Sequence, residues 1–142
     1  MKRNLVLAKY LEVSPDDVQK SYGDNTFTVG NQEYMVCTDA EATREARRYI
    51  LDSLWAFNSW FIVDHMSPKM QDVIGGSDIE KYCSDKCESA NEWVSSLIQN
   101  KGKFVKDAID ADGRGHFLSF YDGAENEYTD DAGKTWYIYR QN

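Results

Sequence analysis

The residues best suited to chemistry lie close together between positions 110 and 116. Asp110, Asp112 and His116 combine two carboxylates with one of only two histidines in the chain. Such side chains can hold a metal ion, and a metal-bound water can serve a hydrolase. The spacing copies the first ligand positions of a calcium-binding loop, but Tyr121 stands where that loop requires a bidentate glutamate. A metal-dependent hydrolase is therefore the least favoured hypothesis, and we predict no metal site and no cofactor.

A second candidate site is basic, and its members could contact the phosphates of a nucleotide: Arg44, Arg47, Arg48, Arg114 and His116. Arginine recognises phosphate through charge-assisted hydrogen bonds, while a Trp or Tyr ring can stack on the base. The alternative is structural, because Glu41, Glu45 and Asp52 lie three or four residues from Arg44 or Arg48, as in ion pairs on an exposed helix. A protein that sequesters a nucleotide signal is thus the second hypothesis.

Recognised catalytic signatures are missing from the sequence. No phosphate-binding glycine loop, dinucleotide-binding fingerprint, zinc-protease helix or serine-hydrolase elbow occurs. Cys83 and Cys87 are spaced to share one helix face, but tetrahedral zinc needs further ligands. His65 follows Phe61 and Ile62 at helical spacing, so we expect a buried and hydrogen-bonded ring. We predict no catalytic residue and interpret the protein as a non-enzyme.

The strongest signal is the placement of acidic residues near the end of the chain. Eight carboxylates fall within 25 residues and are opposed only by Arg114: Asp107, Asp110, Asp112, Asp122, Glu125, Glu127, Asp130 and Asp131. If the loop after Asp122 folds beside the preceding helix, these groups form one acidic surface. Spaced carboxylates can imitate a phosphate backbone and attract a basic protein that binds nucleic acid. We predict this surface to be the partner-binding site.

Composition limits the class of protein and of partner. The 142 residues fit a single domain spanning 1–142, and a hydrophobic content of 42% supports a folded core. A net charge of −8 disfavours direct binding to nucleic acid or to a membrane. The odd number of cysteines, three, and the apolar run broken at Lys9 and Glu12 favour reduced thiols in a cytoplasm.

Four helix starts are indicated by capping residues: Ser14-Pro15, Thr38 with Glu41, Ser67-Pro68, and Ser77 with Glu80. The residues near the N-terminus predict a short amphipathic helix. Apolar spacing predicts a helix from Asp39 to near Asn58, then an aromatic segment over 59–66 and a break at Gly75-Gly76. A longer helix should carry Cys87, Ala90, Val94, Leu97 and Ile98 on one face and continue past a kink at Gly102.

Strands are predicted at both ends of the chain. Residues 26–29 and 33–37 are β-prone and flank Gly30-Asn31, which predicts a hairpin. After a helix end at 110–112 and a glycine turn at 113–115, residues 116–121 and 135–140 have the composition of strands, joined by a polar loop over 122–134. We therefore expect an α+β fold, with a small antiparallel sheet, made of the N-terminal hairpin and a C-terminal strand pair, packed on a helical middle.

Four segments resemble a family of small acidic proteins encoded by bacteriophages, prophages and plasmids: QEYMVCTDAEA, RRYILDSLWAFNSWFIVDH, DADGRGHFLSFYDGAENE and WYIYRQN. The resemblance covers roughly residues 10 to 142. The family has no established activity, so the resemblance supplies no catalytic residue. It implies a phage or mobile-element protein acting in the cytoplasm of a bacterial host.

Analogy of size and charge then suggests a function class. Small acidic phage proteins often inhibit host machinery, including CRISPR and restriction systems. The leading hypothesis is an accessory protein that binds and inhibits a basic, nucleic-acid-handling or defence protein of the host through its acidic surface, as a nucleic-acid mimic. Its oligomeric state is left open.

Overall fold

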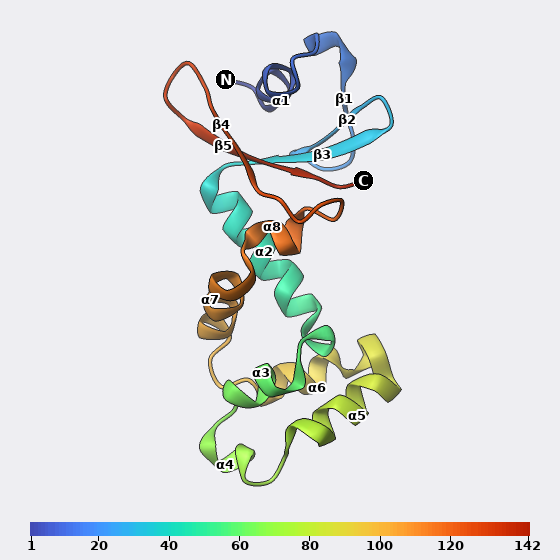
Figure 1. Ribbon diagram of the computed structural model, residues 1–142, viewed down its shortest axis with the longest axis vertical. Helices are drawn as coiled ribbons and strands as arrows, with labels where there is room; N and C mark the ends of the chain where they lie inside the picture. Colours follow the sequence, from blue (N-terminus) through green and yellow to red (C-terminus); the bar gives the residue numbers. More distant parts are fainter. The chain divides into compact units, whose positions relative to one another are not determined.

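A computed structural model describes all 142 residues and confirms the α+β class, with one five-stranded antiparallel sheet (Figure 1). The contacts divide the chain into two compact units. Unit 1 comprises Met1–Ala46 and Asp112–Asn142, and unit 2 comprises Arg47–Ala111. The single domain expected from the sequence stays a prediction. No helix combines the length and apolar character that a membrane span requires.

The sheet belongs to unit 1 and joins the two ends of the chain. Its strand order is β1-β2-β3-β5-β4. The bounds are Val18–Lys20 for β1, Thr26–Val29 for β2, Gln32–Cys37 for β3, Asn126–Thr129 for β4 and Thr135–Arg140 for β5. The predicted N-terminal hairpin is confirmed, and Gly30 at its turn has a φ of +61°. The predicted strand at 135–140 is confirmed as β5, which pairs with both β3 and β4.

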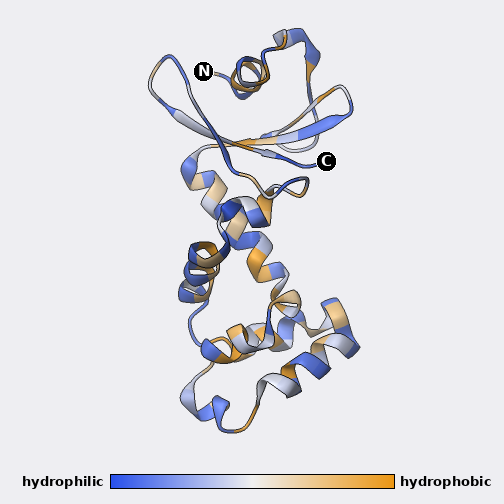
Figure 2. Ribbon diagram, in the orientation of Figure 1, coloured by the Kyte–Doolittle hydropathy of each residue, from blue (hydrophilic) through white to orange (hydrophobic).

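Helix α1 (Arg3–Leu11) covers one face of this sheet. The predicted amphipathic helix is confirmed, and its buried residues Val6, Leu7 and Ala8 pack on the sheet. Their partners share one face of the strands because side chains alternate along each strand: Val18, Phe27, Tyr34, Val36, Trp136 and Ile138. Figure 2 shows hydrophobic residues on α1 and in the middle of the sheet, with hydrophilic residues toward the hairpin ends.

Two predicted helix starts lead to elements of different length. Ser14 Oγ accepts from the amide of Asp16, but the turn η1 (Pro15–Asp17) is a single 3-10 turn because β1 follows at once. The capping box at the start of α2 (Asp39–Asp52) is confirmed: the Thr38 amide donates to Glu41 Oε1 at 2.8 Å, and the Glu41 amide donates to Thr38 Oγ1 at 3.3 Å. Helix α2 ends before the predicted Asn58, and the turn η2 (Leu54–Ala56) follows.

The prediction of a strand at 116–121 is wrong. The segment begins with a short helix, α8 (Arg114–Leu118), and its buried residues Phe117, Leu118 and Ser119 are consecutive rather than alternate. Phe120 is 59% exposed, and His116 is exposed. The polar loop expected at 122–134 contains β4, which is the true hairpin partner of β5. Because β4 is an edge strand, its alternate side chains remain exposed and polar.

Unit 2 is helical. Its elements are α3 (Ser59–Asp64), α4 (Pro68–Gln71), α5 (Gly76–Lys86), η3 (Cys87–Ala90), α6 (Asn91–Leu97) and α7 (Lys101–Asp112), the last of which ends one residue inside unit 1. Their core contains buried aliphatic and aromatic residues: Ile50, Leu54, Ile62, Ile79, Val94 and Phe104. The predicted helix start at Ser67-Pro68 is confirmed, since Ser67 Oγ accepts from the Met70 amide.

Two other sequence expectations for unit 2 need correction. At the start of α5 the Gly75 amide donates to Asp78 Oδ2 at 2.9 Å, so the predicted cap at Ser77 and Glu80 lies inside the helix. The long helix breaks before Gly102, because Ile98 forms a β-bridge with Met66. Asn100 then caps α7, accepting from the Lys103 amide at 3.0 Å.

Candidate functional site

Arg114 is the centre of a polar cluster in unit 1. Its Nε lies 2.8 Å from Glu125 Oε1, and its Nη1 donates to Asp39 Oδ1 at 2.8 Å and to Thr43 Oγ1 at 3.0 Å. The guanidinium also lies over the ring of Tyr137, 4.7 Å from its centroid. Only 12% of the Arg114 side chain is exposed. Arg114 thus forms ion pairs with Asp39 and Glu125.

The backbone brings these residues together from three segments. Gly113, with a φ of +82°, turns the chain from α7 into α8, which begins at Arg114. Gly115 lets the chain after α8 pass close by, since a Cβ placed there would lie 2.5 Å from the Gly123 carbonyl oxygen. That returning chain supplies Glu125. Asp39 comes from the first turn of α2, where a carboxylate also opposes the helix dipole.

Charge and burial fix the protonation of this cluster. Burial disfavours the Arg114 cation, but hydrogen bonds to Glu125 and Asp39 outweigh burial and raise its pKa. The Tyr139 hydroxyl, on a fully buried side chain, donates to the same Glu125 oxygen. Burial, followed by that contact, raises the pKa of Tyr139 well above its ordinary value. The cluster therefore contains a permanent cation whose Nε and Nη1 donors already bind protein groups, which reduces the capacity of Arg114 to bind a phosphate.

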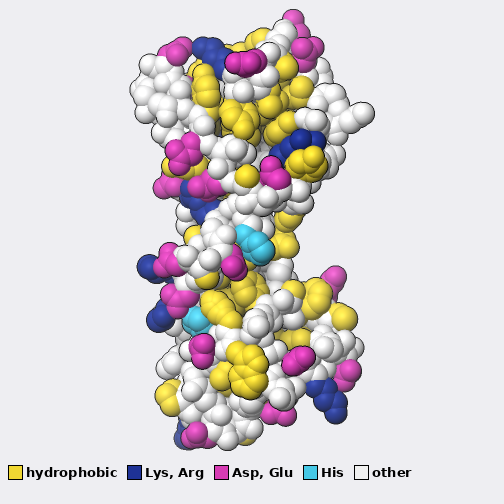
Figure 3. Space-filling view, in the orientation of Figure 1, with side chains coloured by type: hydrophobic (Ala, Val, Ile, Leu, Met, Phe, Trp, Pro, Cys, Tyr) yellow, Lys and Arg dark blue, Asp and Glu magenta, His cyan; other side chains and the backbone are white.

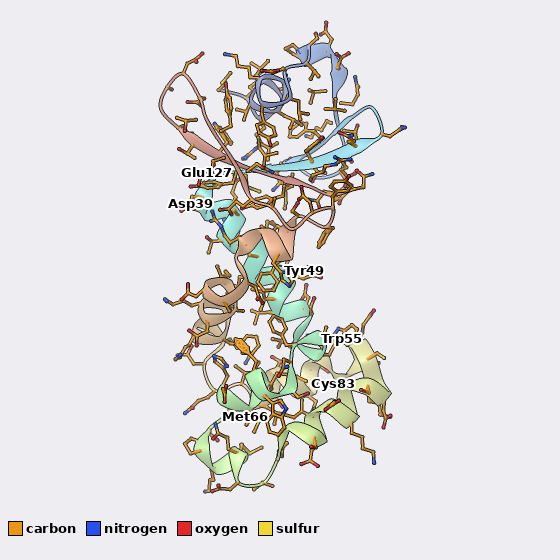
Figure 4. All side chains as sticks on the ribbon, in the orientation of Figure 1. Asp39, Tyr49, Trp55, Met66, Cys83 and Glu127 are labelled. Atoms are coloured by element: carbon orange, nitrogen blue, oxygen red, sulfur yellow. The ribbon has the colours of Figure 1, made fainter.

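The carboxylates around Arg114 extend to the protein surface. The side chain of Asp39 is 74% exposed, and that of Glu125 is 28% exposed. Glu127 in β4 is exposed and pairs in register with Tyr137, whose ring Arg114 covers. Figure 3 shows acidic side chains gathered at the flank of unit 1 where Figure 4 labels Asp39 and Glu127. We call Asp39, Glu125 and Glu127 the acidic face.

Other members of the predicted acidic surface have structural contacts. Asp130 is 5% exposed, and its carboxylate accepts from Trp136 Nε1 and from the Lys134 amide, each at 3.0 Å. The Trp136 bond, with the turn amides, lowers the pKa of Asp130. Asp122 accepts from Ser119 Oγ at 2.8 Å and from a turn amide. Both residues therefore hold turns in place, and Asp130 is buried while Asp122 is exposed.

Asp131 and Asp112 remain at the surface of unit 1. The side chain of Asp131 is 88% exposed, and Lys9 of α1 lies 3.0 Å away. Asp112 is exposed at the end of α7. An exposed ion pair of this type adds little stability. These two carboxylates are accessible to a partner, but Asp131 forms an ion pair with Lys9.

Asp107 and Asp110 belong to unit 2 and are bound to its own cations. Asp110 pairs with Lys106 at 2.7 Å. Asp107 Oδ2 lies 2.6 Å from Lys103 Nζ and 2.9 Å from His65 Nε2, and these contacts lower its pKa. The other nitrogen of His65 lies 2.8 Å from the Phe61 carbonyl oxygen, and 8% of its side chain is exposed. The expectation of a buried, hydrogen-bonded His65 is confirmed.

The residues of the alternative sites are distributed over both units. Arg44 is exposed in unit 1, whereas Arg47 and Arg48 belong to unit 2. His116 is exposed, and its ring stands perpendicular to that of Phe117. No group of three or more His, Cys, Asp and Glu side chains is arranged to hold a metal ion.

The two units differ in charge. Unit 1 contains 8 Lys and Arg against 14 Asp and Glu, a net charge of −6, while unit 2 contains 8 against 10, a net charge of −2. The sequence interpretation missed Asp39, because its place at a helix start already explained it. The pairing of Asp39 with Arg114 depends on residues 75 positions apart, which spacing along the chain does not reveal.

Comparison of the chain with protein-family models, with curated proteins and with solved structures gives no match.

Proposed function

We propose that this protein is a non-enzymatic accessory factor of a phage or mobile element. It binds a basic, nucleic-acid-handling or defence protein in the cytoplasm of a bacterial host and inhibits it, in the manner of CRISPR or restriction inhibitors. The binding site is the acidic face of unit 1. The observation that supports this proposal most directly is the exposure of Asp39 and Glu127 beside an arginine that orders their surroundings.

The physical argument rests on charge and rigidity. Unit 1 carries −6 of the net −8, so a basic partner is steered toward this unit rather than toward unit 2. Arg114 holds Asp39 and Glu125 in fixed positions, which limits the conformational entropy that these side chains lose on binding. Carboxylates held in place on a sheet edge and a helix start can occupy positions that phosphates would occupy on a nucleic acid.

The first experiment recovers the partner. The tagged full-length protein is expressed in a bacterial host, and co-purified proteins are identified by mass spectrometry. We expect a basic protein that binds nucleic acid, and nucleic acid should compete with this protein for that partner. Recovery of no stable partner would remove the proposal, and a partner that binds equally well in the presence of excess nucleic acid would contradict the mimicry.

The second experiment tests the face itself with charge variants that leave intact Asp122 and Asp130, the two carboxylates that hold turns. Asp39→Asn combined with Glu127→Lys should weaken binding to the purified partner by about tenfold or more at low salt. The matched control is Asp85→Asn with Glu88→Lys, which makes the same charge change on exposed residues of unit 2. Equal loss in both double variants would show that net charge, and not this face, governs binding.

A further inference from the structure

A pocket with an apolar floor opens in unit 1 between the start of α1 and strands β1, β2 and β5. Its volume is about 660 Å³, within the range of small-molecule sites. Val18, Phe27 and Trp136 line it, and each is more than nine-tenths buried in the core. This pocket is separate from the acidic face, because it shares no residue with Asp39, Glu125 or Glu127.

The charge of the pocket is opposite to that of the surrounding unit. Lys2, Arg3 and Lys20 line it against a single acid, Asp24, which gives a net charge of +2 in a unit of net charge −6. Solubility alone does not explain three cations around one hollow of an acidic protein. A concave site with low-dielectric walls focuses the potential of such charges on an entering anion.

The three cations have different roles. Arg3 donates two hydrogen bonds of 2.7 Å to Glu41, so its charge is largely neutralised and its side chain is fixed. Lys20 lies 3.7 Å from Asp24 in a solvent-exposed pair, which is weak. Lys2 precedes α1, whose first turn has no side-chain cap and no acidic residue. Lys2 and Lys20, together with the positive end of the helix dipole, therefore provide the attraction for an anion.

From these observations we propose that the pocket binds a small phosphate monoester with a planar apolar body, the chemistry of a nucleoside monophosphate. The phosphate interacts with Lys2 and Lys20, and the apolar body rests on the edges of Val18, Phe27 and Trp136. Two available lysines suit one phosphate group, and the floor favours an ester with an apolar body over the free ion. This inference does not depend on the proposed partner.

Trp136 gives a local readout of binding, since it is the only tryptophan of unit 1. The full-length protein labelled with ¹⁵N is titrated with adenosine monophosphate, and the four indole N–H signals are followed by NMR. We expect a saturable shift of the Trp136 signal without comparable shifts of Trp55, Trp60 or Trp93. Adenosine and inorganic phosphate, titrated separately, should each bind about tenfold more weakly or worse.

Variants at the pocket test the role of the lysines. Lys2→Ala with Lys20→Ala should weaken binding about tenfold or more. Lys9→Ala is the control, because Lys9 lies on α1 but pairs with Asp131 outside the pocket, so its loss should leave the affinity unchanged. The indole spectrum without ligand shows whether each variant is folded. The proposal is overturned if the titration leaves the Trp136 signal unmoved, if adenosine binds as tightly as its phosphate, or if the double variant binds normally.

Discussion

Arg114 Nε lies 2.8 Å from Glu125 Oε1, and this pair joins the start of α8 to the chain that returns toward β4. The same glutamate oxygen accepts from the Tyr139 hydroxyl of β5. One carboxylate oxygen therefore connects a helix, a strand and the segment between them. Arg114 Nη1 lies 2.8 Å from Asp39 Oδ1 at the start of α2. The cluster thus contributes to the stability of unit 1 as well as to the shape of the acidic face.

Loss of the Arg114 cation should destabilise unit 1. Arg114→Met keeps a long apolar side chain at this position but leaves Glu125 without its cation, and we expect a loss of roughly 2 to 3 kcal/mol in the free energy of unfolding. Arg114→Lys should lose roughly 1 kcal/mol, because an ammonium cannot bridge Glu125 and Asp39 as a guanidinium does. Urea unfolding measures both values. Arg44→Met, on an exposed arginine of α2, is the control and should change stability by less than about 0.5 kcal/mol.

Two glycines that flank Arg114 should respond to alanine for different reasons. Gly115→Ala places a Cβ within 2.8 Å of three backbone atoms of residues 123–125, which cannot move without displacing Glu125, so we expect a loss of about 3 kcal/mol or more. A Cβ at position 113 would have no neighbouring atom within 4 Å, but alanine is strained at a φ of +82°. Gly113→Ala should therefore lower the free energy of unfolding by about 1 to 2 kcal/mol. Gly102→Ala, in α7, should cause no loss. A Gly102→Ala variant that unfolds at a lower temperature than either of the other two variants would contradict this account.

The elements predicted correctly are those whose signals are local. The hairpin of β2 and β3 follows from two β-prone runs around Gly30, and the start of α2 follows from the reciprocal bonds of Thr38 and Glu41. Each signal involves residues that are close in sequence, so the surrounding fold has little influence on it. The strand β5 was recognisable for a similar reason, since Trp136, Ile138 and their neighbours are aromatic or β-branched.

The elements predicted wrongly depend on distant contacts. Residues 116–121 have a strand-like composition, yet the Ser119 amide donates to the Gly115 carbonyl oxygen at 2.8 Å and closes a helical turn. The need for glycine at position 115 becomes clear only in the folded chain, where the backbone of residues 123–125 packs against it. Similarly, Asp130 lies in a segment with the composition of a solvated loop, but the residue is buried and its carboxylate accepts from Trp136 Nε1. Charge counting alone therefore overestimated how many carboxylates a partner could reach.

The ion pair of Glu41 and Arg3 should make stability depend on acidic pH. Burial of Glu41 works in the opposite direction, but the hydrogen bonds from Arg3 and Thr38 lower its pKa from 4.5 to about 2. The folded protein therefore binds this proton less readily than the unfolded chain does. The stabilisation is present above about pH 4.5 and is lost as the pH falls toward 2, by roughly 2 kcal/mol in total.

Glu41→Gln and Arg3→Met should both reduce that dependence. Free energies of unfolding are measured in urea at several pH values between 4.5 and 2. The difference in stability between wild type and either variant should be largest at pH 4.5 and shrink as the pH falls. A difference that stays constant over this window would show that the pair contributes packing but no charge-dependent stability.

Thiol reactivity should separate the three free cysteines. Cys37 is fully buried in β3, and burial, reinforced by Glu41 and Glu45, raises the pKa of its thiol to about 12. Cys83 is 8% exposed, and burial raises its pKa as well. Cys87 is exposed at the end of α5.

Because only the thiolate reacts, iodoacetamide near pH 8 should modify the native protein once, at Cys87, and the urea-denatured protein at all three cysteines. Intact mass spectrometry counts the additions, and Cys87→Ser is the control that should leave the native protein unmodified. Rapid native labelling of Cys37 would mean that β3 opens readily and that the sheet is less firmly packed than its contacts with α1 and β5 indicate.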